Sequence, residues 1–343
     1  MRRFGDVTIS IGSDFVAVVE VHRPPANFFD VCLIESLSDA YEALDDDEDC
    51  RAIILCSEGR HFCAGADFTA ASDAAPVDLD DAGSLYREAL RLFKTRKPVV
   101  AAIQGSAVGG GLGLACSADF RVGSPTTRLA ANFARLGIHH GFGLSVTLPK
   151  IIGQQAALEM LYTGRRVAGG EAHVLGLVDR IAEDVEVRGA AHGFAANLAI
   201  SAPLALQSIR QTMRSSLMDE LAPAMAREAS EQVRLKGSSD FLEGIAASAE
   251  RRTFPSTKSV AGPEPARIWC CGTNPGCLVL PVPGCLIRRA IRAADRPRGW
   301  LRPQDPRSFR DECGLKNSRM SFASSENCSA AGRCPPPRTQ SIS

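Results

Sequence analysis

The sequence lacks an excess of charge of either sign, and it lacks any long apolar run. Its 343 residues contain 39 Lys and Arg against 39 Asp and Glu, so the charge of the whole chain gives no reason to expect a nucleic-acid partner. No apolar run reaches the roughly 18 residues that a membrane span requires, and the N-terminal segment "MRRFGDVTIS" has no apolar stretch typical of a secretory signal. We therefore expect a soluble, cytoplasmic protein that binds neither nucleic acid nor membrane.

Paired cysteine motifs are also absent. The chain has 12 cysteines, but Cys270, Cys271, Cys277 and Cys285 do not show the C-x₂-C spacing of zinc sites. We therefore expect free thiols, as in a reduced compartment, and no metal site.

The composition changes abruptly near residue 257. The chain from Thr257 onward holds 14 Lys and Arg against 6 Asp and Glu, together with 11 of the 20 prolines, whereas residues 1–256 hold 25 against 33. No sustained periodicity is present there, so residues 257–343 are predicted to form a low-complexity, disordered tail. A shifted or read-through reading frame after "SAERR" is a second hypothesis for this change.

The first 256 residues alternate between strand and helix patterns. In chain order the predicted elements are a strand at 14–24, a helix at 30–47 with Asp30 as N-cap, a strand at 50–59, a helix at 84–96, strands at 97–105 and 118–124, and a helix at 154–164. From Ala190 the pattern is helical almost throughout. Strands alternating with helices, followed by a helical close, indicate an α/β fold.

Two of these strands lead into loops of small residues. The strand "KPVVAAIQG" is followed by Gly109, Gly110 and Gly111, and the strand "CRAIILCSEG" is followed by "RHFCAGADF". Either loop alone is consistent with a tight turn. Together the loops can bring two backbone N–H groups to one point, as an oxyanion hole requires. The spacing fits neither a dinucleotide-binding fingerprint nor a P-loop.

The order of these motifs resembles the enoyl-CoA hydratase/isomerase (crotonase) family. The resemblance rests on "HFCAGADF", then "KPVVAAIQGSAVGGGLGLACSADFRV", then "LYTGRRV" and "GLVDRI", and it extends from about residue 5 to residue 254. It implies a crotonase-like spiral of ββα units over residues 1–195 and a helical section over 196–256 that builds homotrimers or hexamers. It also implies acyl-CoA thioesters as substrates, with no cofactor apart from the coenzyme A of the substrate.

The resemblance assigns roles to individual residues. The N–H groups of Ala66 and Gly110 would form the oxyanion hole for the thioester oxygen, and the loop around Ala64 would receive the adenine end of coenzyme A. The other residues expected to bind substrate are Gly65, Asp67, Gly109, Gly111, Gly113 and Phe133. The start of the helix after the glycines adds a favourable potential for the oxyanion.

The sequence departs from the family's hydratases at both acid/base positions. Those enzymes carry glutamates where this chain has Gly113 and, by ungapped count, Phe133. In the related dihydroxynaphthoyl-CoA synthases a catalytic aspartate lies near the register of His140. Since histidine transfers protons near neutral pH, His140 is the first candidate for an acid/base group and His139 the second. Packing or hydrogen bonding within the loop is the alternative for both.

Other residues receive lesser roles. Asp67 is expected to order the oxyanion loop, and Asp119 to make a structural contact. Cys63 and Cys116 are expected to be small neighbours of the pocket rather than nucleophiles. The segment "TGRRV", with Arg165 and Arg166, reads as a surface turn or as a phosphate contact.

Three functions remain open at this point. The first is an acyl-CoA lyase, isomerase or hydratase that stabilises a thioester enolate. The second is a protein that binds acyl-CoA without turning it over, which the loss of both glutamates motivates. The third is a structural trimer whose tail recruits partners.

Overall fold

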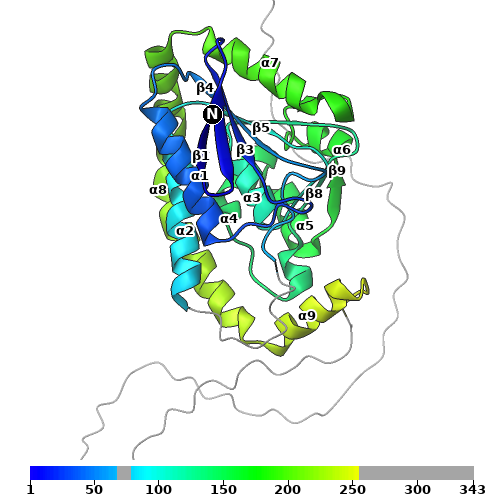
Figure 1. Cartoon of the computed structure of the whole chain (residues 1–343). Coiled ribbons are helices and arrows are strands. Elements are labelled where there is room, and N and C mark those ends of the chain that lie inside the picture. The colour runs from blue at the N-terminus through cyan, green and yellow to red at the C-terminus, as the bar shows by residue number, and fades with distance from the viewer. Residues whose placement is uncertain (68–78, 255–343) are drawn as a thin grey trace, which may run out of the picture. The chain divides into compact units, whose positions relative to one another are not determined.

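The computed structural model of the chain describes residues 1–67 and 79–254 (Figure 1). The tail predicted at 257–343 lies outside the described residues. Within the described part no helix is long and apolar enough to cross a membrane. The predicted boundary between residues 195 and 196 falls inside a helix, α7 (Val187–Ala199).

The strands of the described residues form two sheets. A seven-stranded sheet has the spatial order β1-β2-β3-β4-β5-β7-β10, in which β1, β2 and β3 pair antiparallel and the strands from β3 onward pair parallel. Its strands are β1 (Arg2–Phe4), β2 (Val7–Ile11), β3 (Val16–Val21), β4 (Ala52–Ser57), β5 (Val99–Ala102), β7 (Phe120–Gly123) and β10 (Arg180–Ile181). A three-stranded sheet contains β6 (Ser106–Val108), β8 (Arg128–Ala130) and β9 (Arg166–Ala168).

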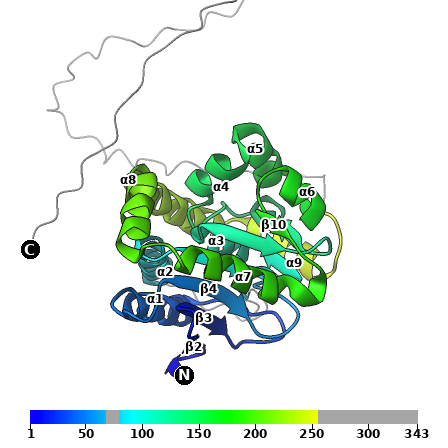
Figure 2. The same cartoon turned by 90° about the horizontal axis from the view of Figure 1, so that it is seen from above.

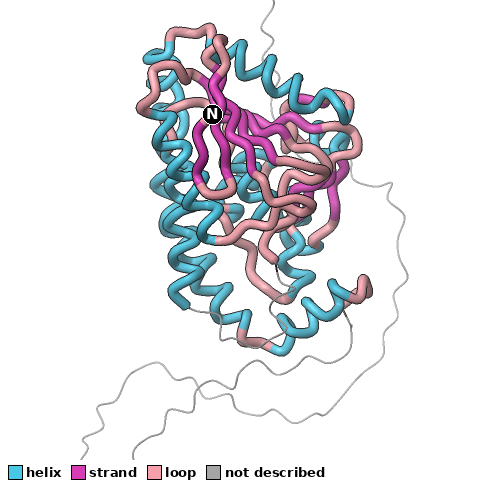
Figure 3. Tube along the Cα trace, in the orientation of Figure 1, coloured by secondary structure: helices cyan, strands magenta, loops and turns pink. Residues whose placement is uncertain are grey.

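Helices surround the strands, as Figure 3 shows. In chain order the described helices are α1 (Val31–Asp45), α2 (Leu79–Lys94), α3 (Gly110–Ser117), η2 (Asn132–Leu136), α4 (Leu144–Ile152), α5 (Gln154–Thr163), α6 (Gly169–Val174), η3 (Asp184–Glu186), α7, α8 (Pro203–Lys236) and α9 (Ser239–Ala249). The helices α1, α2 and α8 lie side by side in Figure 1, where α2 packs against both others. The predicted α/β class is confirmed.

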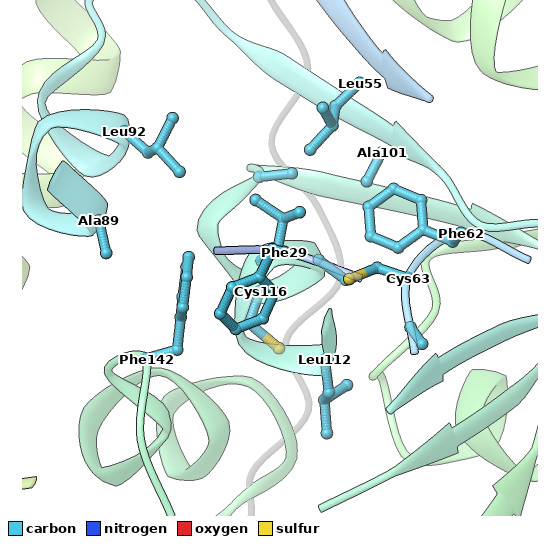
Figure 4. Close-up of a cluster of buried hydrophobic side chains, with 14 of the residues drawn as sticks. Phe29, Leu55, Phe62, Cys63, Ala89, Leu92, Ala101, Leu112, Cys116 and Phe142 are labelled. Carbon is cyan, nitrogen blue, oxygen red and sulfur yellow. The ribbon is translucent and has the colours of Figure 1, made fainter. Parts of the chain in front are cut away.

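Helices cover both faces of the larger sheet, which explains why its central strands are apolar on both sides. On β4, Ile54 and Cys56 face α7, which crosses that side of the sheet (Figure 2). The alternate residues Ile53 and Leu55 belong to the core on the other side. Figure 4 shows part of that second core, where the rings of Phe29 and Phe142 lie close together.

Local predictions hold where short-range signals were strong. Asp30 caps α1, since its carboxylate accepts a hydrogen bond from Leu33 N–H at 2.8 Å. The sequence patterns did not indicate the hairpin of β1 and β2 or the three-stranded sheet, whose strands have three to five residues each. Such short segments carry too few residues for a periodicity to be read.

The predicted structural role of Asp119 is confirmed. Its largely buried carboxylate accepts hydrogen bonds from Arg210 Nε at 2.8 Å and Arg214 Nη1 at 2.6 Å, both on α8, and from Val99 N–H at 2.8 Å. Burial alone would raise the pKa of Asp119, but the charges of Arg210 and Arg214 outweigh burial and lower it. These interactions connect α8 to the first residue of β5.

Candidate active site

The two loops of small residues meet in the structure. Cys63, in the loop after β4, forms a parallel bridge with Ala107 of β6. Cys63 N–H donates to Ser106 O at 3.0 Å, and Val108 N–H donates to Cys63 O at 3.0 Å. These bonds hold the "CAGAD" loop against the strand that leads into the three glycines, so the predicted convergence of the two loops is confirmed.

Each of the three glycines is required by a close approach or by the backbone. Gly109 has a φ of +58°, a conformation that side chains disfavour. A Cβ on Gly110 would lie 2.2 Å from Phe29 Cζ, and a Cβ on Gly111 would lie 2.2 Å from Cys63 O. A larger residue at Gly111 would therefore push the two loops apart, and one at Gly110 would displace Phe29.

The expected oxyanion donors, Ala66 and Gly110, border the same pocket. Gly110 is the first residue of α3, so its N–H has no acceptor within the helix. A Cβ built on Gly65, the neighbour of Ala66, would lie only 3.7 Å from Gly110 N. Within residues 1–67 and 79–254, no backbone oxygen accepts the N–H of Ala66. Both residues therefore border the pocket with N–H groups that have no backbone acceptor among the described residues.

The pocket has a volume of about 310 Å³ and is mainly apolar. Of the residues predicted to bind substrate, those that line it are Ala64, Gly65, Asp67, Gly109 and Phe133. Gly111 and Gly113 are outside the described lining. Gly111 packs against the backbone of Cys63, and Gly113 packs beneath Phe142, since a Cβ on Gly113 would lie 2.5 Å from Phe142 Cβ.

Comparison with known proteins places this geometry in a family. The family model described as "Enoyl-CoA hydratase/isomerase" matches residues 12–258. The chain belongs to the enoyl-CoA hydratase/isomerase family. The predicted crotonase-like fold is confirmed by the crystal structure of an enoyl-CoA hydratase/isomerase from Pseudoalteromonas atlantica T6c. That structure is similar with a TM-score of 0.66 and 26% identity, over 74% of this chain and all of that one.

Named relatives of the family match the same part of the chain. The Bacillus subtilis (strain 168) protein named "Probable enoyl-CoA hydratase" is 36% identical over 250 residues, which span 71% of this chain and 96% of that protein. The carnitinyl-CoA dehydratase of Proteus mirabilis (strain HI4320) is 34% identical over 243 residues, which span 69% and 93%.

The two histidines lie beside the pocket of this family member but are outside its described lining. Their rings stack with centroids 4.1 Å apart. His139 Nδ1 lies 2.7 Å from His140 O, and His140 Nε2 lies 2.8 Å from Ser145 Oγ. Burial, with a smaller effect of His139, lowers the pKa of His140 to about 4. His140 is therefore neutral at pH 7 and weakly basic.

A buried carboxylate lies behind the same wall of the pocket. Glu228 of α8 is fully buried, and it accepts hydrogen bonds from Gly143 N–H at 2.8 Å and Ser145 N–H at 2.9 Å. Burial raises the pKa of Glu228, although these donors act in the opposite direction. Glu228 thereby holds the N-terminus of α4, which directly follows Gly141 and Phe142 of the pocket lining.

Sequence reasoning missed the polar residues of the pocket wall. Tyr86 of α2 and Gln232 of α8 meet at Gly141, where a Cβ would lie 1.9 Å from the Tyr86 hydroxyl and 2.6 Å from Gln232 Nε2. Burial, with a smaller effect of the Glu228 charge, raises the pKa of Tyr86, although the backbone of Phe142 acts in the opposite direction. No sequence motif indicated either residue, because each lies within an ordinary helical pattern outside the glycine loops.

Cys63 and Cys116 were predicted not to act as nucleophiles, and their surroundings agree with this prediction. Cys63 and Cys116 are buried, and burial raises the pKa of Cys63 to about 12 and that of Cys116 to about 11. Both thiols therefore stay protonated and are poor nucleophiles. Arg165 forms ion pairs with Glu159 and Glu171, which agrees with a surface turn.

Proposed function

We propose that the protein is an acyl-CoA-processing enzyme that stabilises a thioester enolate through the N–H groups of Ala66 and Gly110. The observation that supports this most directly is the meeting of the two glycine and alanine loops at one mainly apolar pocket. The relatives named enoyl-CoA hydratase and carnitinyl-CoA dehydratase favour a lyase within the family.

The chemistry follows from where charge develops. Removing the α-proton of a thioester places negative charge on the carbonyl oxygen, and two fixed N–H donors lower the energy of that enolate. One such donor contributes on the order of 3 to 4 kcal/mol, or about a hundredfold to a thousandfold in rate. No further cofactor enters this proposal, since coenzyme A arrives with the substrate.

The proton-transfer group must differ from that of the family's hydratases if Gly113 and Phe133 stand in place of their glutamates. His140 remains the sequence candidate, but it has no place in the described lining and its Nε2 is engaged by Ser145. Tyr86 borders the pocket, and its raised pKa keeps it a neutral phenol. We propose that Tyr86 donates a hydrogen bond or proton to an oxygen on the acyl group or to the reacting water.

The test is turnover and α-carbon hydrogen exchange by the full chain. Short, long and aromatic enoyl-CoA esters are incubated in deuterium oxide, and mass spectrometry measures hydration and exchange. We expect exchange to fall about a hundredfold or more in Ala66→Pro, which removes one N–H donor, and to persist in Ala66→Ser, which keeps it. Undiminished exchange in a folded Ala66→Pro variant would contradict the oxyanion assignment.

A second set of variants assigns the proton-transfer group. We expect Tyr86→Phe to slow turnover about a hundredfold, the lower range for a lost acid or base, and His140→Ala to change it little. The reverse result would return the role to His140.

A second candidate function is acyl-CoA binding without turnover. The observation that favours it is the packing of Phe142 over Gly113, which leaves no space at the position of the hydratase glutamate. Tight thioester binding without exchange for any ester offered would establish this alternative. For either function we propose the homotrimer or hexamer implied by the family.

A further inference from the structure

A second cavity lies beside the acyl pocket and is lined by arginines. Its volume is about 1100 Å³. Three residues, Asn132, Leu136 and Ser248, line both cavities. The basic residues of its lining are Arg60, His61, Arg128, Arg135, Arg166, Arg251 and Arg252, and no Asp or Glu of the described residues lines it.

The register of the three-stranded sheet gathers part of this charge. Arg128 of β8 lies beside Ser106 of β6, and Ala130 lies beside Arg166 of β9. Because successive residues of a strand point to opposite faces, Arg128, Ala130 and Arg166 share the face that lines the cavity. Leu129, which lies between Arg128 and Ala130, and Val167, which follows Arg166, are fully buried in the core on the other face.

Most of these arginines have no carboxylate partner among the residues that the structure describes. Arg252 pairs with Glu243 and Glu250, and Arg135 Nε donates to Thr163 O at 2.6 Å. No described ion pair involves the remaining four, which are Arg60, Arg128, Arg166 and Arg251. Like charges facing one cavity repel each other, so an anion would relieve an unfavourable interaction there.

His61 lies in the positive potential of the same arginines. Its Nδ1 atom is buried without a hydrogen-bond partner in the described part of the chain, and the residue lines the cavity. Burial lowers the pKa of His61, and the charges of Arg60 and Arg128 lower it further. A neutral imidazole can still donate one hydrogen bond to an anion.

We propose that this cavity binds a small organic anion that carries two or more phosphate groups. Arginine forks match phosphate oxygens in geometry and charge, and a cavity of this size exceeds the need of a single inorganic anion. The sequence allowed a phosphate contact for Arg165 or Arg166, and the proposal assigns this contact to Arg166. Its neighbour Arg165 forms ion pairs with Glu159 and Glu171 instead. Arg60 and His61 belong to the loop that also carries Ala66, but neither Ala66 nor Gly110 lines this cavity, so the proposal does not rest on the oxyanion assignment.

Calorimetric titration of the full chain with pyrophosphate tests the site. We expect binding that weakens as salt is added, because screening reduces the attraction between exposed charges. The double variant Arg128→Gln/Arg166→Gln should bind about tenfold more weakly or worse. Arg87→Gln is the matched control, since Arg87 is an exposed arginine on α2 that bonds Ser84 and does not line the cavity. It should bind as the wild type does.

A second variant distinguishes the loss of an arginine that contacts pyrophosphate from the loss of the folded structure. Arg251 adopts a φ of +56° at the end of α9, a conformation that suits glycine better. Arg251→Gly should therefore keep or raise the melting temperature while it weakens pyrophosphate binding. Pyrophosphate should raise the melting temperature of the wild type, and should raise that of the double variant less.

Competition identifies the source of the phosphates. Displacement of pyrophosphate by an acyl-CoA, but not by the matching acyl-pantetheine, would assign the site to the nucleotide end of the thioester. Pyrophosphate that stays bound beside both compounds would assign it to a separate phosphate-bearing ligand. Absence of pyrophosphate binding, or equal binding by the double variant, would overturn the proposal. If binding is absent and the double variant also changes the molecular mass in solution, the face is a contact between copies of the chain instead.

Discussion

Replacing Gly113 by alanine tests whether Phe142 occupies the position of the missing glutamate. The new Cβ would lie 2.5 Å from Phe142 Cβ and 3.0 Å from Phe142 Cγ, about 1 Å closer than carbon atoms pack. The Phe142 Cβ cannot swing away, because its ring packs on Phe29 with centroids 5.5 Å apart. Such overpacking costs about 1 to 3 kcal/mol.

The helix partly offsets this cost. Alanine is favoured over glycine by about 1 kcal/mol within a helix, and Gly113 lies inside α3. We therefore expect Gly113→Ala to lower the free energy of unfolding by up to about 2 kcal/mol. The matched control is Gly193→Ala in α7, where an added Cβ meets nothing within 4 Å. That variant should gain up to about 1 kcal/mol.

A double-mutant cycle makes the reasoning refutable. Phe142→Gly removes the opposing Cβ and suits the φ of +60° at this position, although the lost ring should itself cost about 3 to 5 kcal/mol. In that background Gly113→Ala should become neutral or stabilising. Denaturant unfolding followed by circular dichroism measures all four proteins, with equal m-values as the condition for comparison. The same loss from Gly113→Ala in both backgrounds would refute the contact with Phe142.

Three further predictions concern stability and assembly. Asp119→Asn should lower the free energy of unfolding by about 3 to 5 kcal/mol, since it leaves Arg210 and Arg214 without their buried counter-charge. The pKa of Asp119 is lowered in the folded state, so the wild type should lose this advantage as the pH falls through that pKa, and denaturation curves of both proteins from pH 7 downward would show it. Burial lowers the pKa of His140 to about 4 in the folded protein. The wild type should therefore lose free energy of unfolding relative to His140→Asn as the pH falls from about 6.5 toward 4. A difference in unfolding free energy that does not change with pH would contradict the burial of His140. Light scattering on the full chain should give the mass of a trimer or hexamer, and a monomer would remove that expectation.

Much of the fold followed from the sequence. Strong local signals are enough for α1 with its Asp30 cap and for the buried runs of β4 and β5, because a continuous apolar run and a capping residue act over a few neighbouring residues. The short strands of the smaller sheet gave no such signal. Their place depends on pairing between residues 106–108, 128–130 and 166–168, which no local pattern specifies.

The candidate site divides in the same way. The sequence by itself determined the two loops of small residues and their family, because close backbone approach admits little except glycine and alanine. It also led to the prediction that Gly113 and Phe133 stand where the family's hydratases carry glutamates. Only the tertiary structure decided that Phe142 fills the space beside Gly113, that Tyr86 and Gln232 meet at the pocket wall, and that His140 turns to Ser145. The first two contacts join residues dozens of positions apart, and side-chain packing between distant elements is fixed by the fold as a whole. His140 and Ser145 are only five positions apart, but the course of the loop between them depends on its packing against α8.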